Sequence, residues 1–251
     1  MKIINLFISL LLCAFLIACS KKEKSNEVSH SSTTMTTDAA ANAENKSVAA
    51  DERLGTKWGD DISSHATEVD LKRKSNTPLA EALVQYADKN YQGKSINSIA
   101  VAGGKINFSI LDDHGNKIPM YRVGQRYYLS GREGQSYQLH YENNTLKTFE
   151  IVASVDGVDV INGSEASRKN SGYVLNAQDS LTIEGFRKSA NEVASFTFSQ
   201  PEESYAANSS QGSIQNTGII GTVVYELEAP EVDAKPVNKY APPPNAFPAD
   251  R

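Results

Sequence analysis

The chain has 251 residues, of which 39% are hydrophobic and 22% are charged. This composition allows one or two globular domains and excludes both a small disulfide-stapled protein and a polytopic membrane protein. There are 25 basic and 30 acidic residues, so the formal net charge is −5 at pH 7. A nucleic-acid-binding protein carries a concentrated basic surface, and this charge balance argues against one.

Residues 1–18 have the layout of a secretory signal peptide. A single lysine, Lys2, precedes an apolar run that ends in small residues at Ala18. The run is shorter than the stretch of about 20 apolar residues that spans a bilayer comfortably. We therefore expect the chain to be exported and the signal peptide, which contains Cys13, to be removed.

The end of the apolar run, Leu16-Ile17-Ala18-Cys19, resembles the lipobox of bacterial lipoproteins. The resemblance implies that Cys19 is acylated with fatty acids such as palmitate and becomes the first residue of the mature chain. Two or more acyl chains hold a protein firmly on a membrane. Ser20 follows the cysteine, and by similarity to enterobacterial sorting it implies delivery to the cell outer membrane. The side of that membrane that the protein faces stays open.

Residues 19–76 are rich in Ser, Thr, Asn, Ala, Lys and Glu, and Trp58 is their only aromatic residue. Such a segment buries too little apolar surface to offset the entropy lost on ordering, so we predict a disordered tether. Trp58 stands before Gly59, Asp60 and Asp61 and marks a candidate docking segment. It would dock either on a partner or on the protein's own domain, and the alternative is a chance hydrophobic residue in a linker.

Residues 77–228 are expected to form one domain that begins with a short helix. Thr77 can cap this helix and Pro78 suits its first turn, and the helix is expected to end near Lys89. The apolar residues that share its predicted face are Leu79, Ala82, Leu83, Tyr86 and Ala87.

From Ser95 to Leu227 the hydrophobic period changes to two. Short apolar or alternating runs are separated by turn residues such as Asp156-Gly157, a hairpin pair that needs positive φ. The runs are Ile106–Ile110, Tyr137–Tyr141, Phe149–Val155, Val158–Val160, Gly172–Leu175, Leu181–Ile183, Ala194–Phe198 and Ile219–Tyr225. This pattern predicts a mainly β fold, an antiparallel, jelly-roll-like β-sandwich. Residues 229–251 contain Pro242-Pro243-Pro244 and are expected to be a disordered tail.

No catalytic motif is present. The sequence contains no nucleophile elbow, phosphate-binding loop or dinucleotide fingerprint, and its four histidines lack metal-ligand spacing. We therefore expect no catalytic residues, no cofactor and no metal. Asp156 and Asp159 could form a carboxylate pair or a calcium site, but they lack the oxygen-rich spacing of a calcium loop, and turn formation explains them better.

A segment that interleaves arginines with tyrosines is the best candidate binding surface. Its members are Arg122, Arg126, Tyr127, Tyr128 and Arg132. If exposed, they could bind glycans by stacking and hydrogen bonding, or an anionic polymer by charge. The alternative is a strand pair with its aromatic residues inward and its arginines in solvent.

The block from Val155 to Tyr225 resembles a module of uncharacterised proteobacterial lipoproteins and secreted proteins. The motifs that carry this resemblance are Val-Asp-Gly-Val-Asp-Val at 155–160, Gly-Tyr-Val-Leu at 172–175, Ile-Glu-Gly-Phe-Arg at 183–187, Glu-Val-Ala-Ser-Phe-Thr-Phe-Ser at 192–199, Ser-Tyr-Ala-Ala at 204–207 and Gly-Ile-Ile-Gly at 218–221. The resemblance implies a shared β-rich fold and no particular activity.

Three hypotheses for function follow. The first is a non-enzymatic, lipid-anchored envelope protein that binds an envelope glycan or a protein partner, because a tether raises the effective concentration of a binder at a surface. The second is a hydrolase of peptidoglycan or polysaccharide, which needs two of the carboxylates Asp156, Asp159, Glu184 and Glu192 in one cleft. The third is a structural accessory subunit, which predicts an exposed apolar patch or an unpaired sheet edge.

Overall fold

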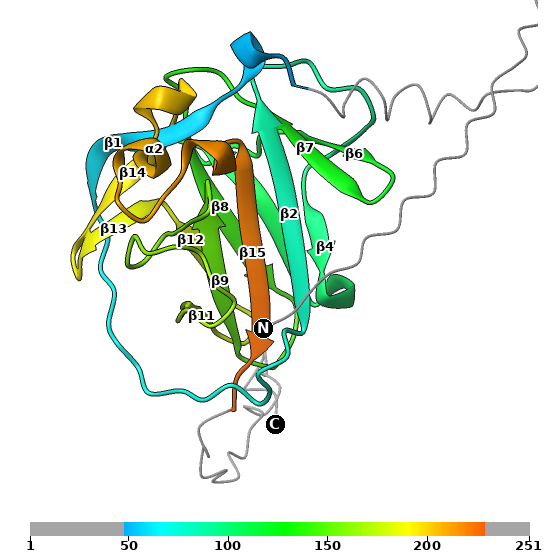
Figure 1. Cartoon of the computed structure of the whole chain (residues 1–251). Helices are drawn as coiled ribbons and strands as arrows, with labels where there is room; N and C mark the ends of the chain where they lie inside the picture. Colours follow the sequence, from blue (N-terminus) through cyan, green and yellow to red (C-terminus); the bar gives the residue numbers. More distant parts are fainter. Residues whose placement is uncertain (1–47, 229–251) are drawn as a thin grey trace, which may run out of the picture. The chain divides into compact units, whose positions relative to one another are not determined.

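The computed structural model describes residues 48–228, which form two β-sheets with a shared core (Figure 1). This arrangement confirms the predicted mainly β, sandwich-like fold. The predicted signal peptide, Cys19 and the proline-rich tail lie outside the described residues. Within residues 48–228, no helix has the length and apolar character needed to cross a membrane.

The first sheet has seven strands. Its order is β1-β14-β8-β5-β4, with β12 paired to β8 and β13 paired to β14. The bounds are β1 Gly55–Ser63, β4 Ile99–Val101, β5 Ile106–Asp112, β8 Ser136–Asn143, β12 Ser180–Ile183, β13 Gly185–Ser189 and β14 Glu192–Ser199. All pairings in this sheet are antiparallel.

The second sheet has eight strands. Its order is β10-β9-β15-β2-β7-β6-β3, with β11 paired to β9. The bounds are β2 Ala80–Ala87, β3 Lys94–Ile96, β6 Met120–Val123, β7 Arg126–Ser130, β9 Phe149–Val155, β10 Val158–Asp159, β11 Tyr173–Leu175 and β15 Ile219–Glu226. The sheet departs from the antiparallel prediction at one place, because β2 and β7 are parallel.

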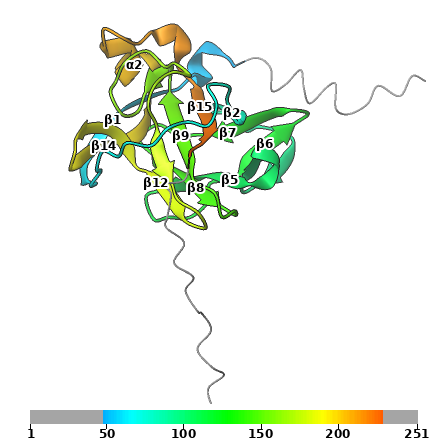
Figure 2. The same cartoon turned by 90° about the horizontal axis from the view of Figure 1, so that it is seen from below.

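The core lies between the two sheets. Seen from below, β12, β8 and β5 lie along one side, and β9, β15 and β2 lie along the other (Figure 2). Phe108 and Tyr141 from the first sheet stack with ring centroids 4.8 Å apart, and both belong to the same buried cluster as Ile151 and Val224 from the second. The Tyr141 hydroxyl also bonds the Thr222 hydroxyl at 2.8 Å, which joins the sheets through a buried polar pair.

A one-turn helix and three short 3-10 helices complete the described chain. The helix, α2, covers Tyr205–Asn208 and follows Ser204, whose hydroxyl accepts a hydrogen bond from the Ala207 backbone N–H at 3.1 Å. The 3-10 helices are η1 Ala50–Glu52, η3 Pro201–Glu203 and η4 Ile214–Asn216; the further three-residue turn η2 Ala102–Gly104 contains a residue with non-helical dihedrals.

The prediction of a disordered tether up to residue 76 is wrong for its C-terminal part, which includes strand β1. Within residues 48–76, which were expected to be disordered, β1 forms an antiparallel pair with β14 from Gly55↔Ser199 to Ser63↔Glu192. Further on, Arg73 forms a salt bridge with Glu150 at 2.5 Å and lies 3.8 Å from the ring centroid of Tyr225. The domain therefore includes backbone hydrogen bonds and a partly buried ion pair from the segment that its composition assigned to the tether.

The predicted helix after Thr77 is wrong, because residues 80–87 form β2. Ala82, Val84 and Tyr86 are buried, while Leu83 between them is exposed, which is the alternation of a strand. This strand lies in the interior of its sheet, between β15 and β7. Pairing on both sides stabilises the extended backbone, and this tertiary context overrides a local helical pattern.

Candidate functional site

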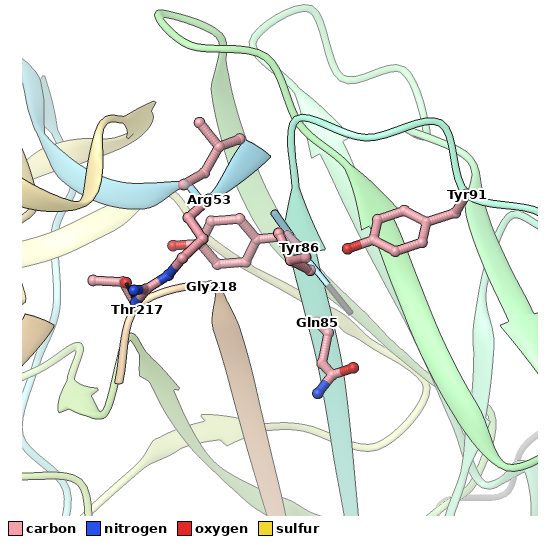
Figure 3. Close-up of a pocket in the computed structure, with 8 residues that line it drawn as sticks. Arg53, Gln85, Tyr86, Tyr91, Thr217 and Gly218 are labelled. Carbon is pink, nitrogen blue, oxygen red and sulfur yellow. Dashed lines mark hydrogen bonds between the residues drawn. The ribbon is translucent and has the colours of Figure 1, made fainter. Parts of the chain in front are cut away.

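A pocket of about 260 Å³ opens where β1, β2 and β15 approach one another at one end of the sandwich (Figure 3). We call it the end pocket. Its lining residues are Val48, Arg53, Leu54, Gln85, Tyr86, Tyr91, Thr217 and Gly218. They come from four segments of the chain: the residues before β1, strand β2, the loop that follows β2, and the turn that enters β15. The volume suits one small molecule or one group of a larger ligand.

Arg53 forms one side of the end pocket. Its Nη2 atom donates to the Ile214 carbonyl at 3.2 Å and to the Thr217 hydroxyl at 3.1 Å. The backbone of Arg53 also bridges to Ala87 at the end of β2. The guanidinium group is thus held in place by one of its nitrogens. Within residues 48–228, no hydrogen bond from its Nε or Nη1 is present.

Tyr91 forms the opposite side. Figure 3 shows the ring of Tyr86 between Arg53 and Tyr91, with the Tyr91 hydroxyl directed toward β2. Only 3% of Tyr91 is exposed, yet its hydroxyl has no hydrogen-bond partner among the described residues. Burial raises the pKa of Tyr91 above its usual range, so the hydroxyl stays protonated and able to donate. A buried hydroxyl without a partner costs about 1–3 kcal/mol.

Tyr91 belongs to a second, smaller core. Its ring stacks on Tyr128 with centroids 4.8 Å apart, and Ala87 and Val123 pack against the pair. The Tyr128 hydroxyl is also buried and lacks a partner in the described part of the chain. Tyr128 does not line the end pocket. The two tyrosines therefore share an environment but differ in their access to the pocket.

The floor of the end pocket is fixed by Asp156. This carboxylate accepts hydrogen bonds from the Tyr86 hydroxyl at 2.6 Å and from the backbone N–H groups of Gly218 at 2.8 Å and Thr56 at 2.7 Å. The Thr56 hydroxyl in turn bonds the hydroxyls of Tyr86 and Tyr137, each at 2.8 Å. Asp156 thereby joins β1, β2 and the entry to β15, the segments that carry most of the lining.

Burial raises the pKa of Asp156 to about 6, although its hydrogen bonds act in the opposite direction. Because the ordinary value is 3.8, the folded protein retains this proton at a pH where the unfolded chain releases it. The contribution of Asp156 to stability is therefore complete below about pH 4 and is lost as the pH rises to about 6. The difference of about two pKa units corresponds to about 3 kcal/mol.

We expect this contribution to appear as a difference between the parent protein and the Asp156→Asn variant. The free energy of urea unfolding, measured at several pH values from 4 to 7, should fall with pH more steeply in the parent, because asparagine does not titrate. Taking the difference removes the carboxyls that are common to both proteins, such as Glu81 and Glu226, whose pKa values are lowered by ion pairs. Parallel pH profiles would contradict this assignment.

The predicted arginine–tyrosine surface does not form a single surface. Arg122 and Tyr127 are paired in register on one face of the β6–β7 hairpin, with the guanidinium 6.0 Å from the ring centroid. Arg126 is opposite Val123, so it lies on the other face. Arg122, Arg126 and Arg132 are exposed, but Arg132 lies beyond β7.

The prediction that Tyr128 belongs to that exposed surface is wrong, because only 1% of this residue is exposed. Strand alternation turns its ring onto Tyr91, where aromatic stacking removes it from solvent. Together with the exposed arginines, this burial corresponds to the alternative interpretation, a strand pair with aromatic residues inward.

Trp58 docks on the protein's own domain, one of the two possibilities for this segment. It lies on β1 opposite Phe196 in register, and its ring stacks on Tyr205 of α2 with centroids 5.0 Å apart. Its residue surface is still 43% exposed. The tryptophan therefore contributes to the attachment of β1 and leaves an aromatic edge in solvent.

Three of the four carboxylates of the hydrolase hypothesis, Asp156, Asp159 and Glu192, make separate structural contacts. Asp159 accepts hydrogen bonds from the backbone N–H groups of Ile161 at 2.9 Å and Asn162 at 3.0 Å in its own turn, whereas Asp156 accepts from the distant Thr56 and Gly218. Glu192 lies 3.6 Å from Lys188 on the β13–β14 hairpin. Asp159 lines a hollow on the outer face of the second sheet, and Asp156, Glu184 and Glu192 do not line that hollow.

One exposed group in the described range brings three possible metal ligands together, namely Asp112, Asp113 and His114. They lie in the turn after β5, where Asp112 accepts the backbone N–H groups of His114 at 2.9 Å and Asn116 at 2.8 Å. These bonds are those of an aspartate that stabilises its own turn, and they account for the cluster.

A second depression crosses the outer face of β2, β9 and β15, and we call it the face groove. It consists of two adjoining hollows of about 150 and 240 Å³ that share Leu83, Ser154, Ala166 and Gly221. Leu83 is 57% exposed. At the rim, Arg168 binds Glu81 through two hydrogen bonds of 2.6 and 2.7 Å. The groove thus has an exposed apolar residue on its floor and an ion pair at its edge.

Comparison of the chain with protein-family models, with curated proteins and with solved structures finds no match. The candidate site therefore rests on its own geometry. Sequence patterns indicated the turn at Asp156 but missed Arg53, which lies in the predicted tether, and Tyr91, which lies in a polar loop. A tyrosine isolated between Asn90 and Gln92 gives no periodic pattern from which burial could be predicted.

Proposed function

We propose that the chain is a lipid-anchored cell-envelope protein whose β-sandwich binds an envelope polymer or a protein partner through the end pocket. The observation that carries this proposal is the buried Tyr91 hydroxyl, which has no hydrogen-bond partner among the described residues, in a pocket that also presents Arg53. Buried polar groups in folded proteins are almost always hydrogen-bonded, and an exception in a pocket is a position for a ligand or an ordered water.

The proposed anchor is Cys19, supported by its lipobox-like context, and the proposed location is the outer membrane. We expect labelled palmitate to enter the full chain and to be absent from the Cys19→Ala variant. Membrane fractions should then lose the variant to the soluble fraction, because the acyl chains hold the protein on the bilayer.

The matched control for the anchor is Cys13→Ala, which removes the other cysteine of the chain. Cys13 lies inside the proposed signal peptide, so this variant should incorporate palmitate as the parent does. Retention of the Cys19→Ala variant on membranes to the same degree as the parent would contradict the proposed anchor.

Binding is favoured over hydrolysis by the roles of the buried carboxylates. Asp156 and Asp159 are almost completely buried; Asp156 accepts from the backbone N–H of Gly218 in another segment, and Asp159 accepts from that of Ile161 in its own turn. A hydrolase of the expected type needs two carboxyl groups about 5–10 Å apart beside the scissile bond. The structural use of these two residues supports a pocket that holds a ligand without reacting with it.

The proposed function is tested by cross-linking in intact cells. A photoreactive residue in place of Gln85, which is exposed and lines the end pocket, should capture an envelope glycan or protein that co-purifies with the full chain. The same residue in place of Gln125, in the exposed β6–β7 turn, is the matched control. Equal capture at the two positions, or none at Gln85, would contradict a binding role for the end pocket.

A second candidate function, a structural accessory subunit, is favoured by the face groove. Leu79, just before β2, is 41% exposed, and Leu83, within β2, is 57% exposed. An exposed apolar residue on a sheet face is a contact point for another protein. A photoreactive residue in place of Leu83 distinguishes the two functions. Capture of a protein at Leu83 and none at Gln85 would favour the accessory role.

A further inference from the structure

The chemistry of the end pocket limits the charge of its ligand. Among residues 48–228, eight line the end pocket; Arg53 is the charged one, and none of the eight is acidic. Outside the lining, Glu52 is paired with Lys89 at 3.5 Å, so the neighbouring acidic charge is balanced. Beneath the lining, the Asp156 carboxylate is covered by the Tyr86 hydroxyl and the Gly218 N–H, which donate to it. Arg53 is therefore the charged side chain that a ligand in the pocket meets, and it favours an anion.

The arrangement of donors narrows the ligand further. A guanidinium group donates charge-assisted hydrogen bonds to a carboxylate. Arg53 is anchored through Nη2, the nitrogen that both of its two-nitrogen forks share, so a carboxylate would bind through a single N–H bond from Nε or Nη1, which have no acceptor within residues 48–228. The anchoring removes much of the rotational freedom that the side chain would lose on binding, which improves affinity.

Tyr91 lies across the pocket from Arg53, with Tyr86 between them (Figure 3). Its buried hydroxyl is a donor without an acceptor, and the exposed amide of Gln85 lies on the same strand as Tyr86. A ligand that reaches from Arg53 to Tyr91 would thus meet a cation at one end and a neutral hydrogen-bonding group at the other. A simple inorganic anion would satisfy only one of these groups.

We propose that the end pocket binds a small organic acid, or the acidic group of a larger molecule, with its carboxylate on Arg53 and a hydroxyl or amide oxygen on Tyr91. This inference rests on the proposed binding function and assigns the chemical class of the ligand. Sugar acids and N-acylated amino acids both have this combination of a carboxylate and a neutral polar group.

The test compares two pairs of probes by isothermal titration with the full chain in detergent. Galacturonic acid is compared with galactose, and N-acetylalanine is compared with N-acetylalaninamide, so that each pair differs at the carboxylate. We expect the acid of at least one pair to bind about tenfold more tightly than its neutral analogue. The pair that binds identifies the source of the carboxylate as a sugar or a peptide.

Variants at the two ends of the pocket connect this binding to the structure. Tyr91→Phe removes only a hydroxyl that has no partner within residues 48–228. It should therefore leave the thermal midpoint unchanged or raised while it weakens binding of the acid about fivefold or more. Tyr128→Phe is the matched control, because its hydroxyl is equally unpartnered but lies outside the lining. This control should not change the affinity.

At the other end, Arg53→Gln removes the charge and should abolish the preference for the acid over its neutral analogue. Arg122→Gln removes an exposed arginine outside the end pocket and should keep the preference. Because Arg53 also bonds Ile214 and Thr217, its variant is interpreted together with Tyr91→Phe, which perturbs no existing hydrogen bond.

The outcomes separate this inference from the proposed function. Equal binding of acid and neutral analogue, or tighter binding of inorganic phosphate than of either acid, would overturn the carboxylate assignment while a binding function remained. Failure of every probe to bind would overturn the inference, and the cross-linking at Gln85 would then decide the proposed function independently.

Discussion

A chain that begins at Thr77 should fail to fold, whereas a chain that begins at Val48 should fold as the parent does. Removal of residues 48–76 deletes β1 and exposes the edge of β14, whose Phe196 and Phe198 are completely buried in the intact protein. It also removes the hydrogen bond that the Thr56 N–H donates to the Asp156 carboxylate. The backbone pairing and the core are therefore damaged together.

The same truncation deletes Arg73, the salt-bridge partner of Glu150, and Glu150 is only 8% exposed. An unpaired buried charge costs about 3–5 kcal/mol, which by itself approaches the total stability of about 5–15 kcal/mol for a domain. We expect the fragment 77–251 to show narrow amide dispersion in NMR spectra and no cooperative unfolding transition. The fragment 48–251 is the control, and a fragment 77–251 with the parent's unfolding midpoint would contradict the role assigned to β1.

Strands in the interior of the domain could be predicted because their sequences alternate between apolar and polar residues. In β8 the inward residues Tyr137, Leu139 and Tyr141 alternate with polar ones, and period two is unambiguous over such a run. The hairpin at Asp156-Gly157 was also predictable, and both residues have positive φ, 54° and 75°. Local sequence is sufficient where the strand has one buried face and the turn has a specific backbone requirement.

Strand β1 could not be predicted, because its stability comes from its partner. Its sequence is polar apart from Trp58 and Ile62, and its attachment depends on backbone bonds to β14 and on the buried Thr56. The helix prediction for the residues of β2 was wrong for a different reason. Ala82 and Tyr86 fit both a helical and a strand period, so the long-range pairs with β15 and β7 decide the conformation.

The end pocket was inaccessible to sequence analysis because its residues converge only in the folded chain. Arg53 and Thr217 are 164 positions apart and meet through one hydrogen bond of 3.1 Å. Neither residue belongs to a motif, and each has an ordinary role in a loop or before a strand. What makes the site visible is an unsatisfied group, the Tyr91 hydroxyl, and satisfaction of hydrogen bonds is a property of the three-dimensional structure.

Replacement of Asp156 by alanine should strongly destabilise the fold. Asp156→Ala leaves the N–H groups of Thr56 and Gly218 without an acceptor, at about 1–3 kcal/mol each, and removes one of the two partners of the Tyr86 hydroxyl. Alanine at a φ of 54° adds about 1 kcal/mol of backbone strain. We expect a loss of about 4 kcal/mol or more in the free energy of urea unfolding.

Asp156→Asn tests the same network with less damage. Asparagine tolerates positive φ and keeps one oxygen for Tyr86 and Gly218, but its amide group faces the donor of Thr56, so we expect a smaller loss of about 2 kcal/mol. The exposed Asp113→Ala is the control and should change stability by less than about 0.5 kcal/mol. Because Asp156 also fixes Gly218 and Tyr86 in the lining of the end pocket, the asparagine variant should weaken ligand binding even where it is folded. Equal stability of all three variants would show that the donors around Asp156 find other acceptors, and the floor of the pocket would then need another explanation.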